Sequence, residues 1–431
     1  MSFYGSLTVE KLKEEKAKVE ASYQAFKDKG LSLNMARGVP STEQLELSNG
    51  LLECVSTQEV KLTEEKFDIR NYGCLEGLIE ARRLMGSVLG VPAENVIIGG
   101  NSSLNLMYDT VARAMLFGVY GSNKPWVKYD KVKFLCPVPG YDRHFGICAD
   151  LGIEMINVPM NSDGPDMDLV EKLVAEDETI KGIWCVPMYS NPEGVTYSDD
   201  VVRRFANLSP AAKDFRIFWD NAYCIHHLAD EHDELLNLYD ECCKTGKEDM
   251  VFIFTSFSKV TFPGAAISAL AASKNNIEEI KKHLSMQTIG SDKINQYRHV
   301  EYFKTLDKVK EHMLKHRAII KPKFDAVIEA LEAELKPLDL ADWTKPKGGY
   351  FISVNTLPGC AKRTVQLCKE AGLMLTPAGA PFPYGVDPDD KTIRLAPTFP
   401  GVDELKIAIS LFCTAVKLAS LEKILNQKLA A

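Results

Sequence analysis

Residues 251–259 read VFIFTSFSK, an apolar run from Val251 to Phe254 that ends in hydroxyl side chains and a lysine. Helical segments separate most of the similar apolar runs upstream, which lie at 96–98, 133–136, 154–158, 182–186 and 216–219. Short, nearly all-apolar strands between helices are typical of a mostly parallel sheet covered on both faces. The sequence therefore predicts an α/β fold built on such a sheet.

The pattern changes after about residue 275, where long helices fill residues 275–335. An α+β segment follows, with expected strands at 350–354 and 392–395 and expected helices near 361–371 and from about 402. We therefore predict a large domain over residues 45–310 and a smaller α+β domain. The smaller domain would combine residues 1–44, including a helix over 8–29, with residues 311–431.

Composition excludes several classes of function. The net charge of −8 argues against nucleic acid as the main partner. No apolar stretch is long enough to span a bilayer, and the N-terminus shows no secretory pattern. The 11 cysteines include no CxxC pair, which is typical of reduced thiols in a cytoplasmic protein. The histidines at 226, 227 and 232 are surrounded by acids, so we expect a solvated loop and no metal site.

Polar, aromatic and ionisable residues follow the predicted strands. Ligands of open α/β sheets bind beyond the carboxyl ends of the strands, so we expect these residues to converge on one site. They occupy residues 99–103, 137–141, 187–194, 220–223 and 255–259. Residues 99–103 are compatible with an ordinary helix N-cap or with a phosphate cradle. Lys259 is compatible with a surface lysine or with a desolvated, nucleophilic amine.

Together these segments resemble a known family. Its motifs match, in order, Tyr141, Asn191-Pro192-x-Gly194, Asp220-x-x-Tyr223, Ser256-x-Ser258-Lys259 and Arg394. They are those of the fold type I, aspartate-aminotransferase-like enzymes, which depend on pyridoxal 5′-phosphate (PLP). The resemblance covers nearly the whole chain. The forms Ala36-Arg37-Gly38 and Ser258-Lys259-Val260-Thr261-Phe262 are similar to the MocR-like branch, which includes free-standing aspartate aminotransferases.

The resemblance implies catalytic roles for Lys259, Asp220 and Tyr223. Lys259 would hold PLP as a Schiff base and then act as general base and acid. Asp220 would pair with the ring nitrogen and keep it protonated. Asn191 and Tyr223 would hydrogen-bond the ring O3′ oxygen, and Tyr141 would stack on the ring.

The resemblance also implies ligands for the phosphate and the substrate. The phosphate would contact Asn101, Ser102, Ser103, Ser256, Ser258 and, from a neighbouring subunit, Tyr72, so that a homodimer shares its active sites. Arg394 would bind the substrate α-carboxylate, next to Asn191 and the loop of Arg37 and Gly38. One departure is that residues 260–268 contain no arginine, whereas most relatives have a phosphate-binding arginine there.

An aminotransferase that moves the amino group of aspartate to 2-oxoglutarate by a ping-pong mechanism is the leading hypothesis. A dicarboxylic substrate needs a second cation, for which Arg37 is favoured over Lys293 and Arg298. A PLP-dependent β-lyase is the alternative, because its lysine, aspartate and arginine would look the same. A regulator with a PLP sensor domain is disfavoured by the net charge of −8 and by the roughly forty residues that precede the large domain.

Overall fold

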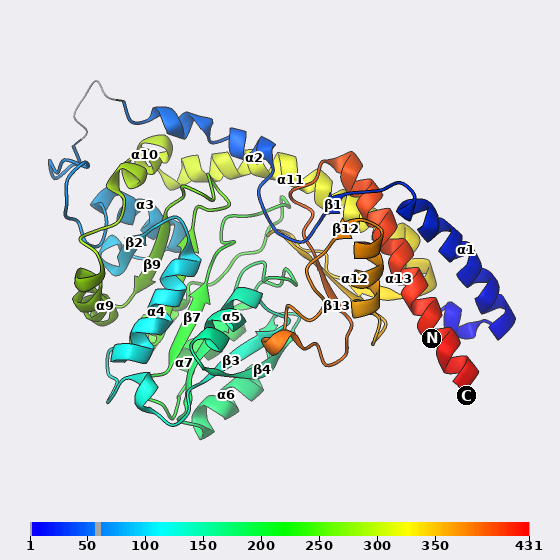
Figure 1. The fold of residues 1–431 in the computed structure, drawn as a ribbon. Helices are drawn as coiled ribbons and strands as arrows, with labels where there is room; N and C mark the ends of the chain where they lie inside the picture. Colours follow the sequence, from blue (N-terminus) through cyan, green and yellow to red (C-terminus); the bar gives the residue numbers. More distant parts are fainter. Residues whose placement is uncertain (1, 57–61, 431) are drawn as a thin grey trace.

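The computed structural model describes residues 2–56 and 62–430, and an eight-stranded sheet dominates it (Figure 1). In spatial order its strands are β2 (Val96–Gly99), β9 (Ser268–Ala272), β8 (Val251–Ser256), β7 (Arg216–Asp220), β6 (Ile180–Cys185), β3 (Lys133–Val138), β4 (Glu154–Asn161) and β5 (Gly164–Pro165). Strands β8, β7, β6, β3 and β4 are parallel, and β2, β9 and β5 pair antiparallel with their neighbours. The predicted α/β fold with a mostly parallel sheet is confirmed.

Helices cover both faces of this sheet. Side chains of a strand alternate between faces, and accordingly Ile97 and Ile98 belong to two separate hydrophobic cores. The core around Ile97 is closed by α4 (Ser103–Phe117), α5 (Asp142–Asp150) and α9 (Lys274–Gln287). The core around Ile98 is closed by α3 (Ile79–Leu89), α6 (Met167–Glu176), α7 (Asp199–Asn207), α8 (Leu238–Thr245) and α10 (Lys293–Phe303). Because both faces are covered, every residue of β6 and β7 is buried.

A smaller α+β part lies beside the large sheet (Figure 1). Its antiparallel sheet consists of β10 (Ala341–Trp343), β11 (Ile352–Thr356) and β13 (Thr392–Leu395). Its helices are α12 (Ala361–Glu370), α13 (Val402–Ala430) and the N-terminal α1 (Val9–Lys27), which packs along α13. A short parallel pair, β1 (Leu33–Asn34) with β12 (Leu373–Met374), ties the N-terminal segment to this part.

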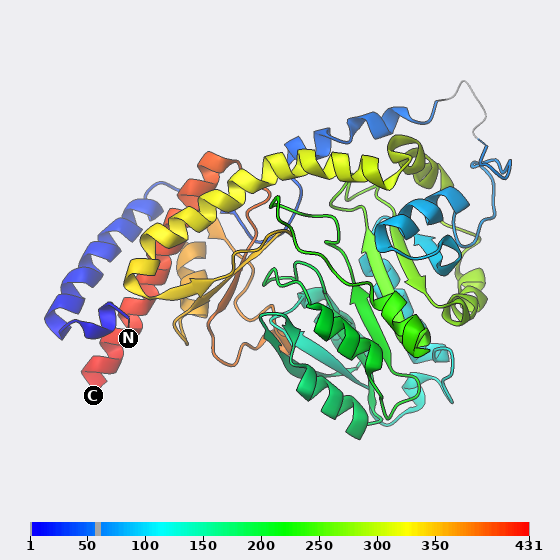
Figure 2. The same ribbon diagram turned by 180° about the vertical axis from the view of Figure 1, so that it is seen from behind.

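Helix α11 (Leu306–Glu334) runs from the large part to the small part (Figures 1 and 2). Val309 and Met313 pack in a core of the large part, whereas Ile320 and Phe324 pack in the core of the small part. The short helix α2 (Thr42–Glu46), from the N-terminal segment, packs near the middle of α11. The predicted division of the chain at residues 44 and 310 stays a prediction.

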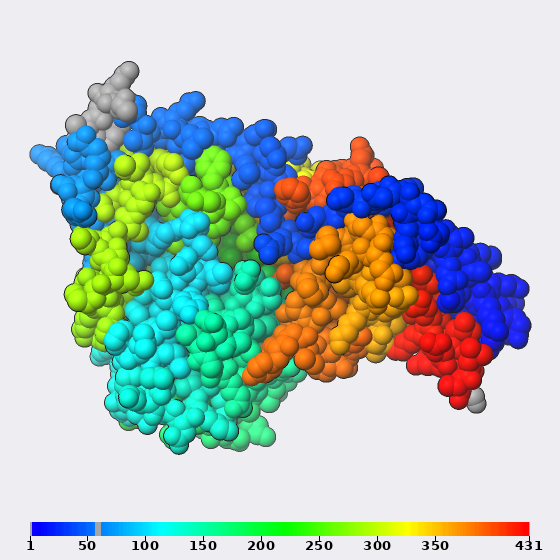
Figure 3. Space-filling view, in the orientation of Figure 1, coloured from blue at the N-terminus to red at the C-terminus, as the bar shows by residue number. Residues whose placement is uncertain are grey.

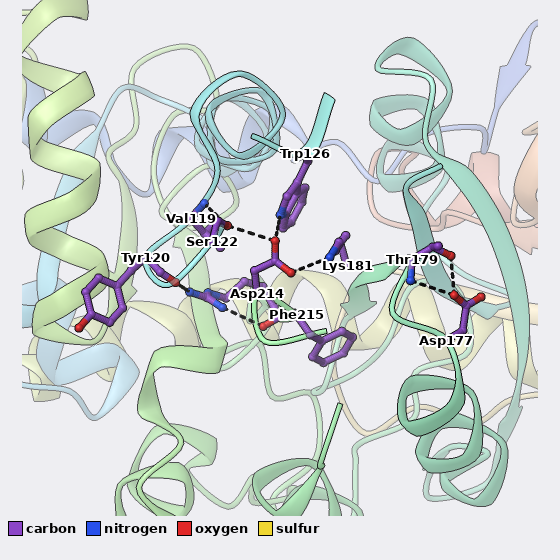
Figure 4. Close-up of polar contacts among 10 residues, drawn as sticks. Val119, Tyr120, Ser122, Trp126, Asp177, Thr179, Lys181, Asp214 and Phe215 are labelled. Carbon is purple, nitrogen blue, oxygen red and sulfur yellow. Dashed lines mark hydrogen bonds and ion pairs between the residues drawn. The ribbon is translucent and has the colours of Figure 1, made fainter. Parts of the chain in front are cut away.

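A buried polar network closes the end of the sheet where β6 and β7 begin (Figure 4). Asp214 accepts hydrogen bonds from Lys181 (2.7 Å), Trp126 Nε1 (3.0 Å) and Ser122 Oγ (3.1 Å). Lys181 is 2% exposed and Asp214 is 3% exposed, so each charge depends on the other for compensation. This network fixes the starts of two strands whose other ends carry Asp220 and the segment that contains Asn191.

Within the described ranges, no helix is long and apolar enough to cross a bilayer. The same residues include no group of three or more His, Cys, Asp and Glu side chains arranged to hold a metal ion. The 11 cysteines are free thiols, most of them buried. Burial raises the pKa of the Cys224 thiol to about 12, so this thiol is protonated at neutral pH.

Candidate active site

A cavity of about 380 Å³ lies between the carboxyl ends of the parallel strands and the small part. Figure 3 shows the surface hollowed where the N-terminal segment (blue), the large part (green) and the small part (orange) meet. The cavity is lined by most of the predicted site residues, namely Arg37, Gly38, Ser102, Ser103, Tyr141, Asn191, Asp220, Tyr223, Ser256, Ser258, Lys259 and Arg394. The strand ends thus converge as the strand pattern predicts.

Lys259 follows β8 in a tight turn. The amides of Val260 and Thr261 both donate to the Phe257 carbonyl, at 2.9 and 2.8 Å, which fixes the direction of the Lys259 side chain. Its Nζ lies 5.2 Å from the centre of the Tyr223 ring. Loss of hydration inside the cavity lowers the pKa of this amine, and the nearby Arg394 charge lowers it further against the opposing effect of the Asp220 carboxylate. A larger share of the amine is therefore neutral and nucleophilic.

Asp220 ends β7 and is 3% exposed. Its Oδ2 lies 3.0 Å from His144 Nε2, and the His144 ring stacks on Trp184 with centroids 4.3 Å apart. Its Oδ1 is buried and has no partner among the described residues. An unpartnered carboxylate oxygen is costly to bury, so this atom is suited to receive a donor from a ligand in the cavity.

Arg394, on β13, is held by three side chains that, like it, line the cavity. Its Nη1 donates to Asp142 Oδ1 (2.9 Å) and to Asn191 Oδ1 (3.1 Å), and its Nη2 donates to Thr376 Oγ1 (3.3 Å). The carbon of the guanidinium lies 4.9 Å from the centre of the Phe351 ring. The Nε–H is buried without a partner among the described residues, so the fork keeps donor capacity for a carboxylate.

Hydroxyl groups and the N-terminus of helix α4 form another part of the cavity lining. Ser102 is the N-cap of the 15-residue helix α4, and its side chain accepts from the Leu104 amide. Ser256 and Ser258 lie 2.9 Å apart, and Ser258 Oγ donates to the Asn101 carbonyl at 2.8 Å. Free N–H groups, hydroxyls and the helix dipole together suit a phosphate dianion. Residues 260–268, which directly follow Lys259, supply no arginine to this part of the lining.

Four predicted residues lie outside the cavity lining. The Asn101 side chain donates to the Pro263 carbonyl instead, and Tyr72 is 77% exposed. Lys293 contacts the Ser291 carbonyl, and Arg298 is bonded to Asn295. Their roles as ligands stay predictions.

The comparisons with known proteins decide the family. The sequence profile of the aspartate amino-transferase family matches residues 7–428. The chain belongs to the aspartate aminotransferase family. It is 43% identical over 408 residues to an aspartate aminotransferase of Corynebacterium glutamicum, covering 95% of this chain and 94% of that protein. It is 48% identical over 410 residues to a protein of Mycolicibacterium smegmatis provisionally named as an aminotransferase, covering 95% and 96% of the two chains.

A solved structure agrees with this assignment. The crystal structure of an aspartate transaminase from Corynebacterium glutamicum superposes with a TM-score of 0.95 at 41% identity, covering 98% of this chain and 99% of that one. The chain is therefore a PLP-dependent transaminase with the fold of aspartate aminotransferases, and the predicted fold type I is confirmed. The narrower assignment to the MocR-like branch stays a prediction.

In this aspartate aminotransferase homologue the structure adds residues that the sequence reasoning missed. His144 supports Asp220, and Asp142 and Thr376 hold Arg394. Arg143 also lines the cavity and is exposed, with no side-chain partner among the described residues. One signal was available for three of these four residues, because positions 142–144 directly follow Tyr141 at the start of a helix beside the predicted rim.

Close packing against Phe351 explains why the loop of residues 36–39 has a glycine at position 38. A Cβ on Gly38 would lie 2.7 Å from the Phe351 ring, so a side chain there would displace the ring that packs against Arg394. Glycine therefore allows the loop to close over the cavity beside the carboxylate-binding candidate. Arg37 next to it is exposed and lines the same cavity.

Proposed function

We propose that the chain transfers the amino group of L-aspartate to 2-oxoglutarate by a ping-pong mechanism. The observation that carries the proposal is the charge pattern of one cavity. Arg394 lies in its wall, and two further, exposed guanidinium groups, those of Arg37 and Arg143, line it. Both substrates are dicarboxylates, so each needs one cation for the α-carboxylate and another for the distal carboxylate.

The residues of the cavity fit PLP. Asp220 Oδ1, which is buried and has no partner in the described part of the chain, would accept from the ring nitrogen, and the hydroxyls of Ser102, Ser256 and Ser258 would hold the phosphate beside the start of α4. Lys259 would provide the amine that binds the cofactor. When bound, PLP supplies an aldehyde that condenses with amines and a ring that accepts an electron pair.

The protein's own groups would then carry out the proton movements. With its pKa lowered, the Lys259 Nζ could take a proton from the substrate Cα and return it two atoms away, on the far side of the substrate nitrogen. Asp220, oriented by His144, would favour a protonated ring nitrogen in the bound cofactor. Arg394 fixes the substrate carboxylate and so holds the Cα hydrogen in one direction toward Lys259.

A homodimer that shares its active sites is part of the proposal. Tyr72 is 77% exposed, and its loop lies against residue 290, since a Cβ on Gly290 would be 2.5 Å from the Gly73 carbonyl oxygen. Nearby apolar side chains are also exposed, namely Met286 (84%) and Ile289 (59%). Exposed apolar groups of this size are suited to an interface. Light scattering on purified protein should give the mass of two chains.

The proposed reaction is tested by a spectral screen of amino acids with the PLP-loaded protein. L-Aspartate and L-glutamate should remove the visible absorbance of the bound cofactor fastest, and 2-oxoglutarate should restore it. Initial rates at several concentrations of both substrates should give parallel double-reciprocal lines. Release of ammonia and a 2-oxo acid, without the absorbance change with any amino acid, would identify a β-lyase instead.

A further inference from the structure

Two buried histidines of α11 contact the main chain directly after Lys259. His312 Nε2 lies 2.9 Å and His316 Nε2 lies 3.0 Å from the Val260 carbonyl oxygen, and the two nitrogens are 3.2 Å apart. A carbonyl oxygen only accepts, so each of these contacts requires an Nε2–H on the histidine. His312 and His316 are four residues apart on one helix, which places both rings on the same face.

A second pair of side chains extends this contact to the small part. Gln44 Nε2, from α2, lies 3.1 Å from His316 Nδ1 and 2.9 Å from the Tyr350 hydroxyl. The Tyr350 hydroxyl in turn lies 3.5 Å from the Lys259 carbonyl oxygen, and the centre of its ring is 5.6 Å from Lys259 Nζ. The carbonyls of residues 259 and 260 are therefore both held by side chains from other elements.

Gln44, His316 and the Val260 carbonyl are matched as donors and acceptors when His316 is neutral. His316 donates from Nε2 and accepts at Nδ1, which is the pattern of a neutral imidazole. Burial lowers the pKa of His316 to about 4, so the ring stays neutral at physiological pH. Gln44 is fully buried, and its Oε1 accepts from the Ser41 amide, so its orientation is set by the start of α2.

We propose that His312, His316 and Gln44, with the Tyr350 hydroxyl, are positioning residues that aim the Lys259 amine. None of these four residues lines the cavity, so they act through the turn of residues 257–261. The bonds within that turn come from the amides of Val260 and Thr261, and the histidines fix the peptide plane between these two residues from the other side. The inference rests on the proposed role of Lys259 as the reactive lysine.

Aim matters here because proton transfer depends steeply on distance. A displacement of about 1 Å at a reacting group can cost roughly a hundredfold in rate. The turn sits at the end of β8, and β8 itself cannot restrain the peptide that follows residue 259. The cluster also joins α2, α11 and residue 350 of the small part, so it fixes the position of the Lys259 backbone relative to both parts of the chain.

The test compares His316→Leu with His316→Gln and Met313→Ala. Leucine removes the hydrogen bonds of His316 to the Val260 carbonyl and from Gln44. In the glutamine variant the side-chain Nε2 can occupy the position of the histidine Nε2 and keep the bond to Val260. Met313, 7% exposed on the same helix, contributes packing in the large part and controls for general destabilisation. Two readouts are needed: hydrogen exchange of the peptide spanning residues 257–261 in cofactor-free protein, and kcat with KM for the loaded enzyme.

His316→Leu should raise exchange in that peptide at least about tenfold and lower kcat roughly tenfold to a hundredfold, with KM within about threefold. His316→Gln should restore both readouts to within about threefold, and Met313→Ala should leave the turn protected. If His316→Leu does not fold, Tyr350→Phe removes both hydrogen bonds of the Tyr350 hydroxyl, from Gln44 and to the Lys259 carbonyl, and should raise exchange in the same peptide. Unchanged exchange and kcat in a folded His316→Leu or Tyr350→Phe protein would overturn the inference. A different reactive lysine in the wild-type protein would instead refute the role of Lys259.

Discussion

Replacing Arg394 by lysine isolates the contribution of the guanidinium fork. Arg394 is 6% exposed and makes its three hydrogen bonds from two nitrogens, to Asp142, Asn191 and Thr376. A lysine ammonium has three N–H groups at one point, so it cannot serve these partners and also grip a substrate carboxylate with two parallel bonds. The substitution keeps the charge and removes the geometry.

The expected loss follows from the bonds given up. A hydrogen bond to a charged group contributes about 1.5–3 kcal/mol, and the lysine variant loses at least one such bond to the substrate. A loss of about 3 kcal/mol corresponds to roughly a hundredfold in kcat/KM. Cofactor affinity should change less than kcat/KM, because in this proposal the phosphate is held by the hydroxyls of Ser102, Ser256 and Ser258 and Arg394 binds the substrate.

Steady-state kinetics with L-aspartate and 2-oxoglutarate, together with titration of the protein with PLP, measure the two effects separately. Asp142→Asn provides a matched control, since it weakens a partner of Arg394 and leaves the guanidinium in place. It should cost less than Arg394→Lys. A kcat/KM for Arg394→Lys within about threefold of wild type would refute the fork as the carboxylate ligand.

Four other changes test separate parts of the structure. Asp214→Ala leaves the Lys181 ammonium (2% exposed) unpaired and should lower the free energy of unfolding by about 3–5 kcal/mol, measured by urea denaturation; a loss below about 1 kcal/mol would contradict the buried pair. Burial raises the pKa of Glu193 from 4.5 to about 7, so the folded state keeps a proton that the unfolded state releases, and wild-type stability should fall as pH rises between these values. The difference in the free energy of unfolding between Glu193→Gln and wild type should therefore shift in favour of the variant by up to about 3 kcal/mol between pH ~4 and pH ~8. An equal difference at both pH values would be contrary evidence. Arg143→Ala should raise KM for aspartate roughly tenfold more than KM for a monocarboxylic amino acid, and equal effects would exclude a contact with the distal carboxylate. Tyr72→Phe should weaken PLP binding about fivefold to tenfold in a fluorescence titration, whereas unchanged affinity would separate this hydroxyl from the phosphate.

The sheet could be predicted where its strands are apolar throughout. β7 and β8 carry unbroken runs of bulky apolar residues that end in polar ones, and β6 carries a shorter run after Lys181 and Gly182, so the strand ends located Asp220 and Lys259 at one cavity. β9 was missed because Ser268-Ala269-Leu270-Ala271-Ala272 has low strand propensity. It forms a strand because it lies between β2 and β8 and pairs with both, which is a tertiary effect.

The site was predicted less completely than the sheet, because side-chain partners depend on distant packing. Residues 312 and 316 are read in sequence only as positions on a long helix, and nothing in the sequence places them at the Val260 carbonyl. The pairing of Arg394 with Asp142 joins residues 252 positions apart and could not be read from either motif. The exposure of Tyr72 is unexplained by one chain alone, which is why it enters the homodimer proposal.

The central claim is that Lys259 binds the cofactor, and reductive trapping tests it most directly. Purified protein is incubated with PLP, reduced with borohydride, digested and examined by mass spectrometry, with Lys259→Ala as the control. The account predicts a yellow protein, a single phosphopyridoxyl adduct on Lys259, and no adduct in the control. An adduct on another lysine, or a colourless protein with no adduct, would contradict it.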